Sequence, residues 1–516
     1  MTIKNLQNGS DIRGIALEGI PGETPNLGKK ETILLSMGYI KWLTAKTEKP
    51  VTSLKIAVGT DSRISGPELK KYMLNTFAYC GANVIDCDMA STPAMFMSTI
   101  FDETLCDGAV MITASHLPFN RNGFKYFSKD GGLDKEDIAA IIKTADSLMD
   151  SYADIEAAID AHSTEFESNI PKLDLIEIYA AHLRILIKDG IGSACDNQAK
   201  PLDGMKITVD AGNGAGGFFA DKVLAPLGAD ITGSRYLEPD GTFPNHAPNP
   251  ENKEAMAAAC EAVIESHADF GLIFDTDVDR SAAVDGNGEA ISRNEIVALA
   301  AALISDEHPG TTVVTDSVTS DHLTDFLEGS LGLKHLRFKR GYRNVINKAV
   351  ELNASGTDCQ LAIETSGHAA YKENYFLDDG AYLATKIVIK AALLKKAGSS
   401  LEELISSLKK PAESKEFRMK IKADDFASYG KDVLEALSSW ADSHGNGISK
   451  VHPNFEGVRI SFDENHGNGW ALLRMSLHDP IMPLNIESDT NGGTEIIGKI
   501  LKDFLSGYAQ LDSSAL

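Results

Sequence analysis

The chain has 516 residues, 43% of them hydrophobic and 24% charged, a composition that excludes a disordered or fibrous protein. Its length is too great for a single hydrophobic core, so several domains are expected. The 49 basic and 74 acidic residues give a formal net charge of −25, which disfavours nonspecific binding to nucleic acid or to an anionic membrane.

The cysteines and the apolar runs indicate the cellular compartment. Six cysteines are scattered without a CxxC pair, as expected for reduced thiols in a cytosol. The first residues hold no apolar signal core, and the longest apolar run, 296–304, is too short to span a bilayer. We therefore expect a cytoplasmic protein without membrane or nucleic-acid partners.

A strand, a polar turn and an amphipathic helix are predicted three times along the chain, at 54–73, 205–224 and 311–327. After each comes a second apolar strand that ends in a polar loop, at 108–116, 270–280 and 359–368. Such units predict an α/β fold of three similar domains with mixed sheets. Because ligands of open α/β sheets collect at the carboxyl ends of strands, the three loops are expected to line one central cleft.

Changes in local composition predict the domain boundaries. Polar, helical-looking sequence over 134–188 leads to the connector GSACDNQAKPLDG, and a second break is expected at DEHPG. After Lys409, an amphipathic segment and short strands predict a smaller C-terminal α+β domain. The expected domains are 1–204, 205–308, 309–410 and 411–516.

The first polar loop places Ser115 after the strand GAVMI. A serine at a strand end can act as a nucleophile, and nearby cations such as His116 and Lys125 would stabilise a phosphoryl group on it. Taken alone, however, the sequence TASH favours an ordinary loop serine with a local backbone hydrogen bond.

The second polar loop carries Asp275, Asp277 and Asp279, followed by Arg280. Three carboxylates at a strand end repel one another unless a hard cation neutralises them, and oxygen ligands suit Mg²⁺. An EF-hand is excluded, because the positions that require glycine and glutamate hold Arg280 and Gly286. A phosphatase with an aspartyl nucleophile remains open on this segment alone.

The third polar loop, ETSGH, offers the carboxylate of Glu364, the hydroxyl of Ser366 and the imidazole of His368, which can hydrogen-bond sugar hydroxyls. The segment RFKRGYRNVI includes Lys339 and Arg340 and is a candidate phosphate contact in an acidic protein. A solvated basic start of a helix is an equally good interpretation of that segment.

Taken together and in this order, the segments resemble those of the α-D-phosphohexomutase superfamily, and the similarity spans nearly the whole chain. The matching segments are NGSDIRG, VGTDSRISGPEL, TASHLPFNRNGFKYF, VDAGNGAGG, EPDGTFPNHAPNPE, FDTDVDR and ETSGH. The resemblance implies four domains around a central cleft. It disfavours the aspartyl phosphatase, since the aspartates of this superfamily bind metal and a serine carries the phosphoryl group.

The resemblance also implies the roles of individual residues, with a phosphoserine at Ser115 and one Mg²⁺ per chain. The implied metal ligands are Ser115, Asp275, Asp277 and Asp279. Arg13 and Arg280 are expected to contact the serine phosphate, and His116 and Lys125 to supply polar and proton-transfer groups. The implied substrate-binding residues are Lys339, Arg340, Glu364, Ser366, His368, Arg474, Ser476 and His478.

The implied activity interconverts hexose 1-phosphate and hexose 6-phosphate through a hexose 1,6-bisphosphate that serves as intermediate and activator. The run HAAYKENYFLDDGAYLA resembles the phosphomannomutase and phosphoglucomutase branch, so mannose or glucose is the expected sugar. A monomer or homodimer is expected.

The C-terminal domain departs from the superfamily pattern. An Arg-x-Ser-Gly-Thr-Glu-Pro loop is usual there, whereas this chain has RMSLHDP at 474–480, with leucine in place of the glycine that lets backbone amides close on a phosphate. This difference keeps alternatives open: a hexose bisphosphate synthase or phosphoglucosamine mutase on the same scaffold, or a noncatalytic sugar-phosphate binding protein.

Overall fold

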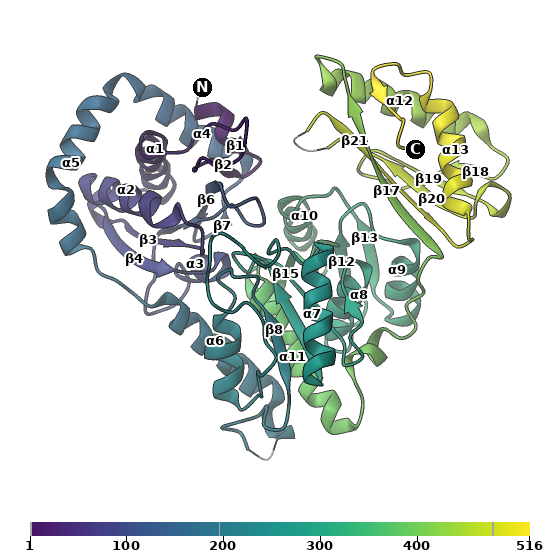
Figure 1. The fold of residues 1–516 in the computed structure, drawn as a ribbon, viewed down its shortest axis with the longest axis horizontal. Helices are drawn as coiled ribbons and strands as arrows, with labels where there is room; N and C mark the ends of the chain where they lie inside the picture. Colours follow the sequence, from purple (N-terminus) through teal and green to yellow (C-terminus); the bar gives the residue numbers. More distant parts are fainter. Residues whose placement is uncertain (1–2, 196, 477–478) are drawn as a thin grey trace. The chain divides into compact units, whose positions relative to one another are not determined.

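The computed structural model describes residues 3–195, 197–476 and 479–516, which form two compact units. The first comprises Met1–Leu303 and Ser366–Leu404, and the second comprises Ile304–Thr365 and Ile405–Leu516. Figure 1 follows the chain through its elements. Among the described residues, no helix combines the length and apolar character that crossing a membrane requires.

The N-terminal part of the first unit contains a mixed sheet in the order β1-β2-β6-β5-β3-β4, with β7 beside β6. β3 is parallel to β4 and β5, whereas β6 is antiparallel to β5 and β2. The strands are Gln7–Asn8 (β1), Asp11–Ile15 (β2), Lys55–Thr60 (β3), Asn83–Met89 (β4), Gly108–Ile112 (β5), Arg121–Ser128 (β6) and Gly131–Gly132 (β7). The helices around it are Lys29–Thr47 (α1), Gly66–Tyr79 (α2), Thr92–Met97 (α3), Lys135–Ser147 (α4) and Tyr152–Asn169 (α5) (Figure 1). Leu175–Ile191 (α6) follows α5 in the chain.

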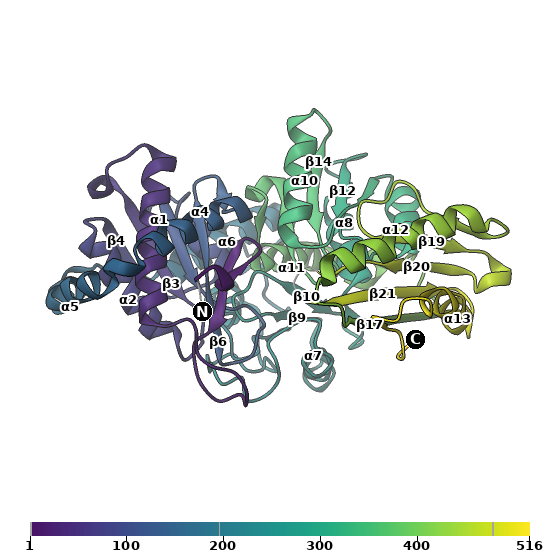
Figure 2. The ribbon, with the colours of Figure 1, turned by 90° about the horizontal axis from the view of Figure 1, so that it is seen from above.

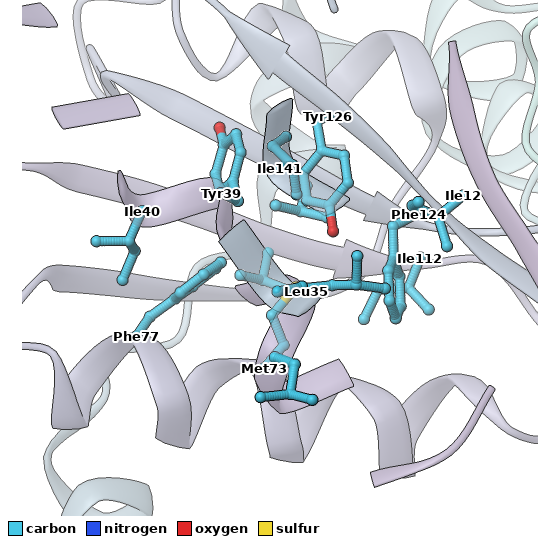
Figure 3. Close-up of a cluster of buried hydrophobic side chains, with 14 of the residues drawn as sticks. Ile12, Leu35, Tyr39, Ile40, Met73, Phe77, Ile112, Phe124, Tyr126 and Ile141 are labelled. Atoms are coloured by element: carbon cyan, nitrogen blue, oxygen red, sulfur yellow. The ribbon is translucent and has the colours of Figure 1, made fainter. Parts of the chain in front are cut away.

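Aliphatic and aromatic side chains together fill the core between this sheet and its helices (Figure 3). The rings of Tyr39 on α1 and Tyr126 on β6 are stacked at 4.7 Å, and the Tyr39 hydroxyl donates to the carbonyl of Phe127 at 2.7 Å. A Cβ at Gly108 would lie 2.1 Å from the Tyr39 oxygen, so only glycine fits there. Every residue of β5 is buried, so the strand that leads to Ser115 lies within the sheet.

The second sheet of the first unit has the order β11-β10-β9-β8, with β8 parallel to β9 and the remaining pairs antiparallel. Its strands are Ile207–Asp210 (β8), Phe270–Phe274 (β9), Ser281–Val284 (β10) and Ala290–Ile291 (β11). In the chain, the helix Lys253–Ser266 (α7) lies between β8 and β9, and the helix Asn294–Ser305 (α8) follows β11. All residues of β9 are buried, and the tight β9–β10 connection carries the three aspartates.

The helix predicted after β8 forms, but it is irregular. The segment after β8 forms a π-helical turn, Phe219–Leu224, and then a 3₁₀ turn, Ala225–Leu227, instead of a regular α-helix. Pro226 lies in the 3₁₀ turn and lacks the amide hydrogen that an α-helix would use, so the helix does not continue as an α-helix. The remaining elements of the first unit are the antiparallel strands Ala369–Tyr371 (β15) and Leu377–Asp378 (β16) and the helix Gly380–Ala397 (α11).

The second unit combines a parallel three-stranded arrangement with a separate antiparallel sheet. β12 (Thr312–Thr315) pairs in parallel with β13 (Lys334–Arg337) and β14 (Cys359–Ile363), joined through α9 (Asp321–Asp325) and α10 (Tyr342–Ala354). The antiparallel sheet has the order β18-β19-β20-β21-β17-β22. Its strands are Glu413–Ile421 (β17), Ile448–Lys450 (β18), Val458–Phe462 (β19), Gly469–Leu473 (β20), Ile481–Ser488 (β21) and Leu511–Asp512 (β22).

The helices α12 (Phe426–His444) and α13 (Gly493–Leu505) share one apolar core with this antiparallel sheet (Figure 2). The rings of Trp440 on α12 and Phe504 on α13 lie 5.4 Å apart. The segment from Pro411 onward therefore has the α+β character that the sequence predicted. The four domain boundaries themselves remain predictions.

A buried arginine joins the antiparallel sheet to the loop after β12. Arg459 on β19 donates to the carbonyls of Ser317 and Thr319 at 3.2 and 3.1 Å and to Asp321 at 3.0 Å. Its guanidinium carbon lies 3.6 Å from the ring centroid of Trp470, and only 1% of the residue is exposed. A desolvated cation on an aromatic face is a strong contact, so Arg459 holds these parts of the second unit together.

We expect Arg459→Met to lower the free energy of unfolding by about 2–3 kcal/mol, because two buried carbonyls lose their donor and Trp470 loses its cation. Trp470 lies in this contact, so urea titration followed by tryptophan fluorescence measures the change. Arg418→Met is the control, since Arg418 is exposed and its removal should change stability by less than about 0.5 kcal/mol. Equal stability of the two variants would contradict the role given to Arg459.

Candidate active site

Ser115 lies just beyond the carboxyl end of β5 and is almost fully buried. Its φ of +50° is in the left-handed region, a conformation that costs a non-glycine residue about 1–3 kcal/mol and that clusters at functional sites. The backbone amide of Ser115 donates to the Thr113 hydroxyl at 2.9 Å, and that hydroxyl donates to Asp61 at 2.6 Å. The loop is therefore held in one conformation.

Arg63 fixes the same loop from the end of the parallel strand β3. Its guanidinium donates to the carbonyls of Ser115, Leu117 and Pro118 at 2.5, 2.6 and 2.8 Å. Only 1% of Arg63 is exposed, and its Nε lies 3.3 Å from Asp61. Because β3 and β5 are parallel neighbours, their carboxyl ends meet at one edge of the sheet, which brings Arg63 to Ser115.

The Ser115 hydroxyl lies between a carboxylate and a guanidinium. Ser115 Oγ donates to Asp275 Oδ2 at 2.9 Å and accepts from Arg280 Nη2 at 2.7 Å. His116 Nδ1 lies 3.4 Å from the same oxygen and also accepts from Arg280. The positive charge of Arg280, followed by burial, lowers the pKa of His116 to about 2, so this imidazole is neutral and acts as an acceptor.

The three aspartates after β9 converge and are fully buried, and each offers a carboxylate oxygen within 4.8 Å of the others. Lys125 on β6 bridges Asp279 and Asp277, with Nζ 3.1 Å from Asp277 Oδ2. Thr92, at the start of α3, donates its hydroxyl to the same Asp277 oxygen at 2.5 Å. Asp277 Oδ1 and Asp279 Oδ1 have no hydrogen-bond partner among the described residues.

The charges of this cluster are unequal. Burial, followed by the charge of Asp279, raises the pKa of Asp275 well above its usual value. Burial alone would also raise the pKa of Asp279, but Lys125, His368 and Arg280 together hold it below its usual range. Buried carboxylate oxygens without partners suit a hard divalent cation, so this donor set fits Mg²⁺.

Two further predicted residues lie beside this cluster. Arg13 on β2 donates to the carbonyl of Thr113 at 2.6 Å and to Asp11 at 2.8 Å, so it supports the backbone before Ser115. His368 Nδ1 lies 2.6 Å from Asp378 and 3.9 Å from Asp279. Burial lowers the pKa of His368, but these two carboxylates, Asp378 first, outweigh burial and raise it to about 9.

The backbone of the ETSGH loop packs against the start of β10. Ser281 donates its amide to the carbonyl of Gly367 at 3.3 Å, and Arg280 and His368 form an isolated β-bridge. Gly367 has a φ of +94°, and a Cβ there would lie 2.5 Å from the Ser281 carbonyl oxygen. Glycine at this position therefore lets Ser366 and His368 lie close to the aspartate loop.

The predicted basic residues of the second unit include an arginine pair. Arg474 follows β20, is 5% exposed, and its Nε has no hydrogen-bond partner within the part of the chain that the structure covers. Burial, followed by the charge of Arg340, lowers the pKa of Arg474. Arg340 donates its backbone amide to Glu456 at 3.1 Å, and its Nε lies 3.9 Å from Asp316. Two guanidinium groups close enough to repel each other attract an anion.

The remaining predicted substrate-binding residues lie in the second unit as well. Glu364 accepts from the amide of Gly341 at 2.6 Å, and Lys339 is exposed. Ser476 donates its amide to Ile481 at 2.9 Å, and its hydroxyl accepts from the amide of Asp479 at 3.3 Å. His478 and the substituted Leu477 lie outside the described residues.

Three residues that hold this site, Arg63, Thr92 and Asn249, were not predicted as site residues. Arg63 lies in the matching segment VGTDSRISGPEL, and Asp378, the partner of His368, begins the acidic DDG after ETSGH. Thr92 lies in a short apolar helix start that carries no functional signal. Only the packing of α3 against the aspartate loop reveals its contact with Asp277.

Comparison with known families agrees with this geometry. Three models of phosphoglucomutase/phosphomannomutase alpha/beta/alpha domains match the chain: domain I at residues 4–150, domain II at 187–288 and domain III at 292–411. This chain belongs to the phosphoglucomutase/phosphomannomutase family. The resemblance to the α-D-phosphohexomutase superfamily and the α/β fold class, with a C-terminal domain of antiparallel sheet and helices, are thereby confirmed.

Individual relatives cover almost the full chain. A phosphoglucomutase/phosphomannomutase of Thermococcus kodakarensis is 30% identical over 503 residues, which span 96% of this chain and 98% of the relative. A phosphomannomutase/phosphoglucomutase of Pseudomonas aeruginosa is 29% identical over a region that spans 89% of this chain and 88% of the relative. A crystal structure of a family protein from Burkholderia thailandensis has the same fold, with a TM-score of 0.73, 23% identity and 98% coverage of both chains.

Proposed function

We propose that this chain is a phosphohexomutase that interconverts hexose 1-phosphate and hexose 6-phosphate, with mannose or glucose as the sugar. The observation that carries the proposal is the position of Ser115 Oγ, in hydrogen-bond contact with Arg280 and with Asp275 of the metal-binding cluster. Membership of the family and the names of the relatives support it.

In the proposed first step, phosphorylated Ser115 transfers its phosphoryl group to the free hydroxyl of a hexose monophosphate. The bond between Ser115 Oγ and phosphorus breaks, a bond from phosphorus to the sugar oxygen forms, and the proton of the sugar hydroxyl ends on Ser115 Oγ. Arg280 Nη2 donates to Ser115 Oγ and stabilises the charge that develops there. The hexose 1,6-bisphosphate then reorients within the site and returns its other phosphoryl group to Ser115, which regenerates the phosphorylated enzyme.

The aspartates Asp275, Asp277 and Asp279, together with the oxygen of Ser115, would hold the Mg²⁺. When bound, this ion supplies positive charge that offsets the negative oxygens of the transferring group. Lys125 forms ion pairs with Asp277 and Asp279, and we assign proton transfer to it. His116, with a pKa of about 2, serves instead as an acceptor that orients Arg280.

The roles of the substrate-binding residues remain those implied by the resemblance. We propose that Arg340 and Arg474 bind the phosphate that is not being transferred, assisted by Lys339, Ser476 and His478. Glu364, Ser366 and His368 are proposed to bind sugar hydroxyls. Asp378 raises the pKa of His368, so the imidazole is protonated and acts as a hydrogen-bond donor. We further propose a cytoplasmic monomer or homodimer, in line with six free cysteines.

The test is turnover of glucose 1-phosphate and mannose 1-phosphate by the wild-type chain with Mg²⁺ and a catalytic amount of glucose 1,6-bisphosphate. We expect both 6-phosphates to form without net consumption of the bisphosphate. Stoichiometric accumulation of bisphosphate from another phosphoryl donor would instead establish a bisphosphate synthase. Turnover of glucosamine 1-phosphate alone would place the chain among phosphoglucosamine mutases, and binding of hexose phosphates without turnover of any would contradict an enzyme.

A further inference from the structure

The long connection before α7 has no role in the mechanism above, although its sequence, EPDGTFPNHAPNPE over 238–251, is one of the segments that match the superfamily. This connection, which we call the 238–251 loop, lies wholly within the first unit. Three sets of contacts hold it, and two of them reach the arginines beside Ser115.

The first set fixes the loop to the end of β8. Nε2 of His246 lies 3.1 Å from both carboxylate oxygens of Asp210, and both residues are buried. The ring of His246 also meets Tyr236 edge-on, with centroids 5.1 Å apart. A Cβ at Gly212 would lie 2.8 Å from Pro248, so the loop backbone is packed closely onto the β8 end.

The second set reaches the turn that carries Arg63. A Cβ at Gly241 would lie 2.4 Å from the carbonyl oxygen of Ser62 and 2.6 Å from the amide of Ile64. The guanidinium carbon of Arg63 lies 5.2 Å from the ring centroid of Phe243. The loop therefore covers Arg63, whose N–H groups donate to the carbonyls around Ser115.

The third set reaches Arg280. Asn249 Oδ1 accepts from Arg280 Nη1 at 3.3 Å and from the amide of Glu251 at 3.0 Å. The other nitrogens of the same guanidinium donate elsewhere: Nε to Asp275 at 3.1 Å and Nη2 to Ser115 Oγ at 2.7 Å. A planar guanidinium held at three corners has one orientation, so Asn249 supplies the contact on the side away from Asp275 and Ser115.

We infer that Gly241 and Phe243 of the 238–251 loop position Arg63, and that Asn249 of the same loop is the positioning residue for Arg280. This inference rests on the proposed function, because it gives the loop a part in phosphoryl transfer at Ser115. It goes beyond the proposed function by assigning a role to residues that would touch neither the sugar nor the transferring phosphoryl group.

The test compares Asn249→Leu, which has a similar shape but no acceptor, with Asn249→Asp, which keeps an acceptor oxygen. The matched control is Asn245→Leu, because Asn245 lies in the same loop and bonds to Asn213 instead of an active-site arginine. We expect Asn249→Leu to lower kcat by about 10- to 100-fold with little change in KM, since a misplaced catalytic group costs about that much. Asn249→Asp should retain most of kcat, and Asn245→Leu should match the wild type.

Crystal structures of the two Asn249 variants separate this inference from the proposed function. We expect Arg280 to lose its hydrogen bond to Ser115 Oγ in Asn249→Leu and to keep it in Asn249→Asp. An Arg280 that stays in place in both variants, or a kcat that falls equally in Asn249→Leu and Asn245→Leu, would overturn the inference. A wild-type chain without mutase turnover would refute the proposed function alone, because the position of Arg280 is read directly.

Discussion

Ser115→Ala is expected to reduce the interconversion of hexose 1-phosphate and hexose 6-phosphate by more than about 10³-fold, because the groups that act together with the nucleophile have no effect without it. The loop should keep its conformation, since its hydrogen bonds come from the backbone of Ser115 and from Arg63 and Thr113. The measurement is kcat for each sugar, together with the intact mass of the protein after incubation with glucose 1,6-bisphosphate.

The mass separates loss of the nucleophile from loss of the fold. Wild-type protein should gain one phosphoryl group and the Ser115→Ala variant none. The control is Ser163→Ala, a half-buried serine on α5 whose hydroxyl donates to the Asp160 carbonyl of its own helix, and it should behave as the wild type. A Ser115→Ala variant that still acquires the phosphoryl group, or that turns over at the wild-type rate, would require another nucleophile.

Asp277→Asn is expected to abolish both turnover and stabilisation by magnesium. A metal that binds only the folded chain adds RT ln(1 + [Mg²⁺]/Kd) to stability, about 2.7 kcal/mol at 100 times Kd. The wild type should therefore melt several degrees higher when magnesium is added. In the variant a neutral amide replaces one of the buried carboxylates, so the ion loses a charged ligand and the shift should disappear.

The melting shift tests the metal site without depending on activity. Asp285→Asn is the matched control, because Asp285 follows β10 as Asp277 follows β9 and is also buried, but it caps a turn by accepting from the amides of Asn287 and Glu289. That variant should melt lower than the wild type yet keep its magnesium shift. An unchanged shift in Asp277→Asn would place the metal at other ligands.

The chemistry of the aspartate loop could be predicted from the sequence because it is local. Asp275, Asp277 and Asp279 follow a strand whose residues are all apolar, and a strand end fixes where such side chains go. The same holds for Ser115 after GAVMI. The type of the helix after β8 could not be predicted, because amphipathic spacing does not distinguish a regular α-helix from the π and 3₁₀ turns that the structure has there.

The sequence by itself determined the fold class, the family and the types of side chain at the ends of the strands, since these depend on periodicity and on short motifs. Only the tertiary structure decided which distant residues hold those side chains. Arg63 reaches Ser115 across 52 positions, Asn249 reaches Arg280 across 31, and Thr92 reaches Asp277 across 185. Such pairs form only where parallel strand ends and loop packing bring segments together, and no local pattern encodes that proximity.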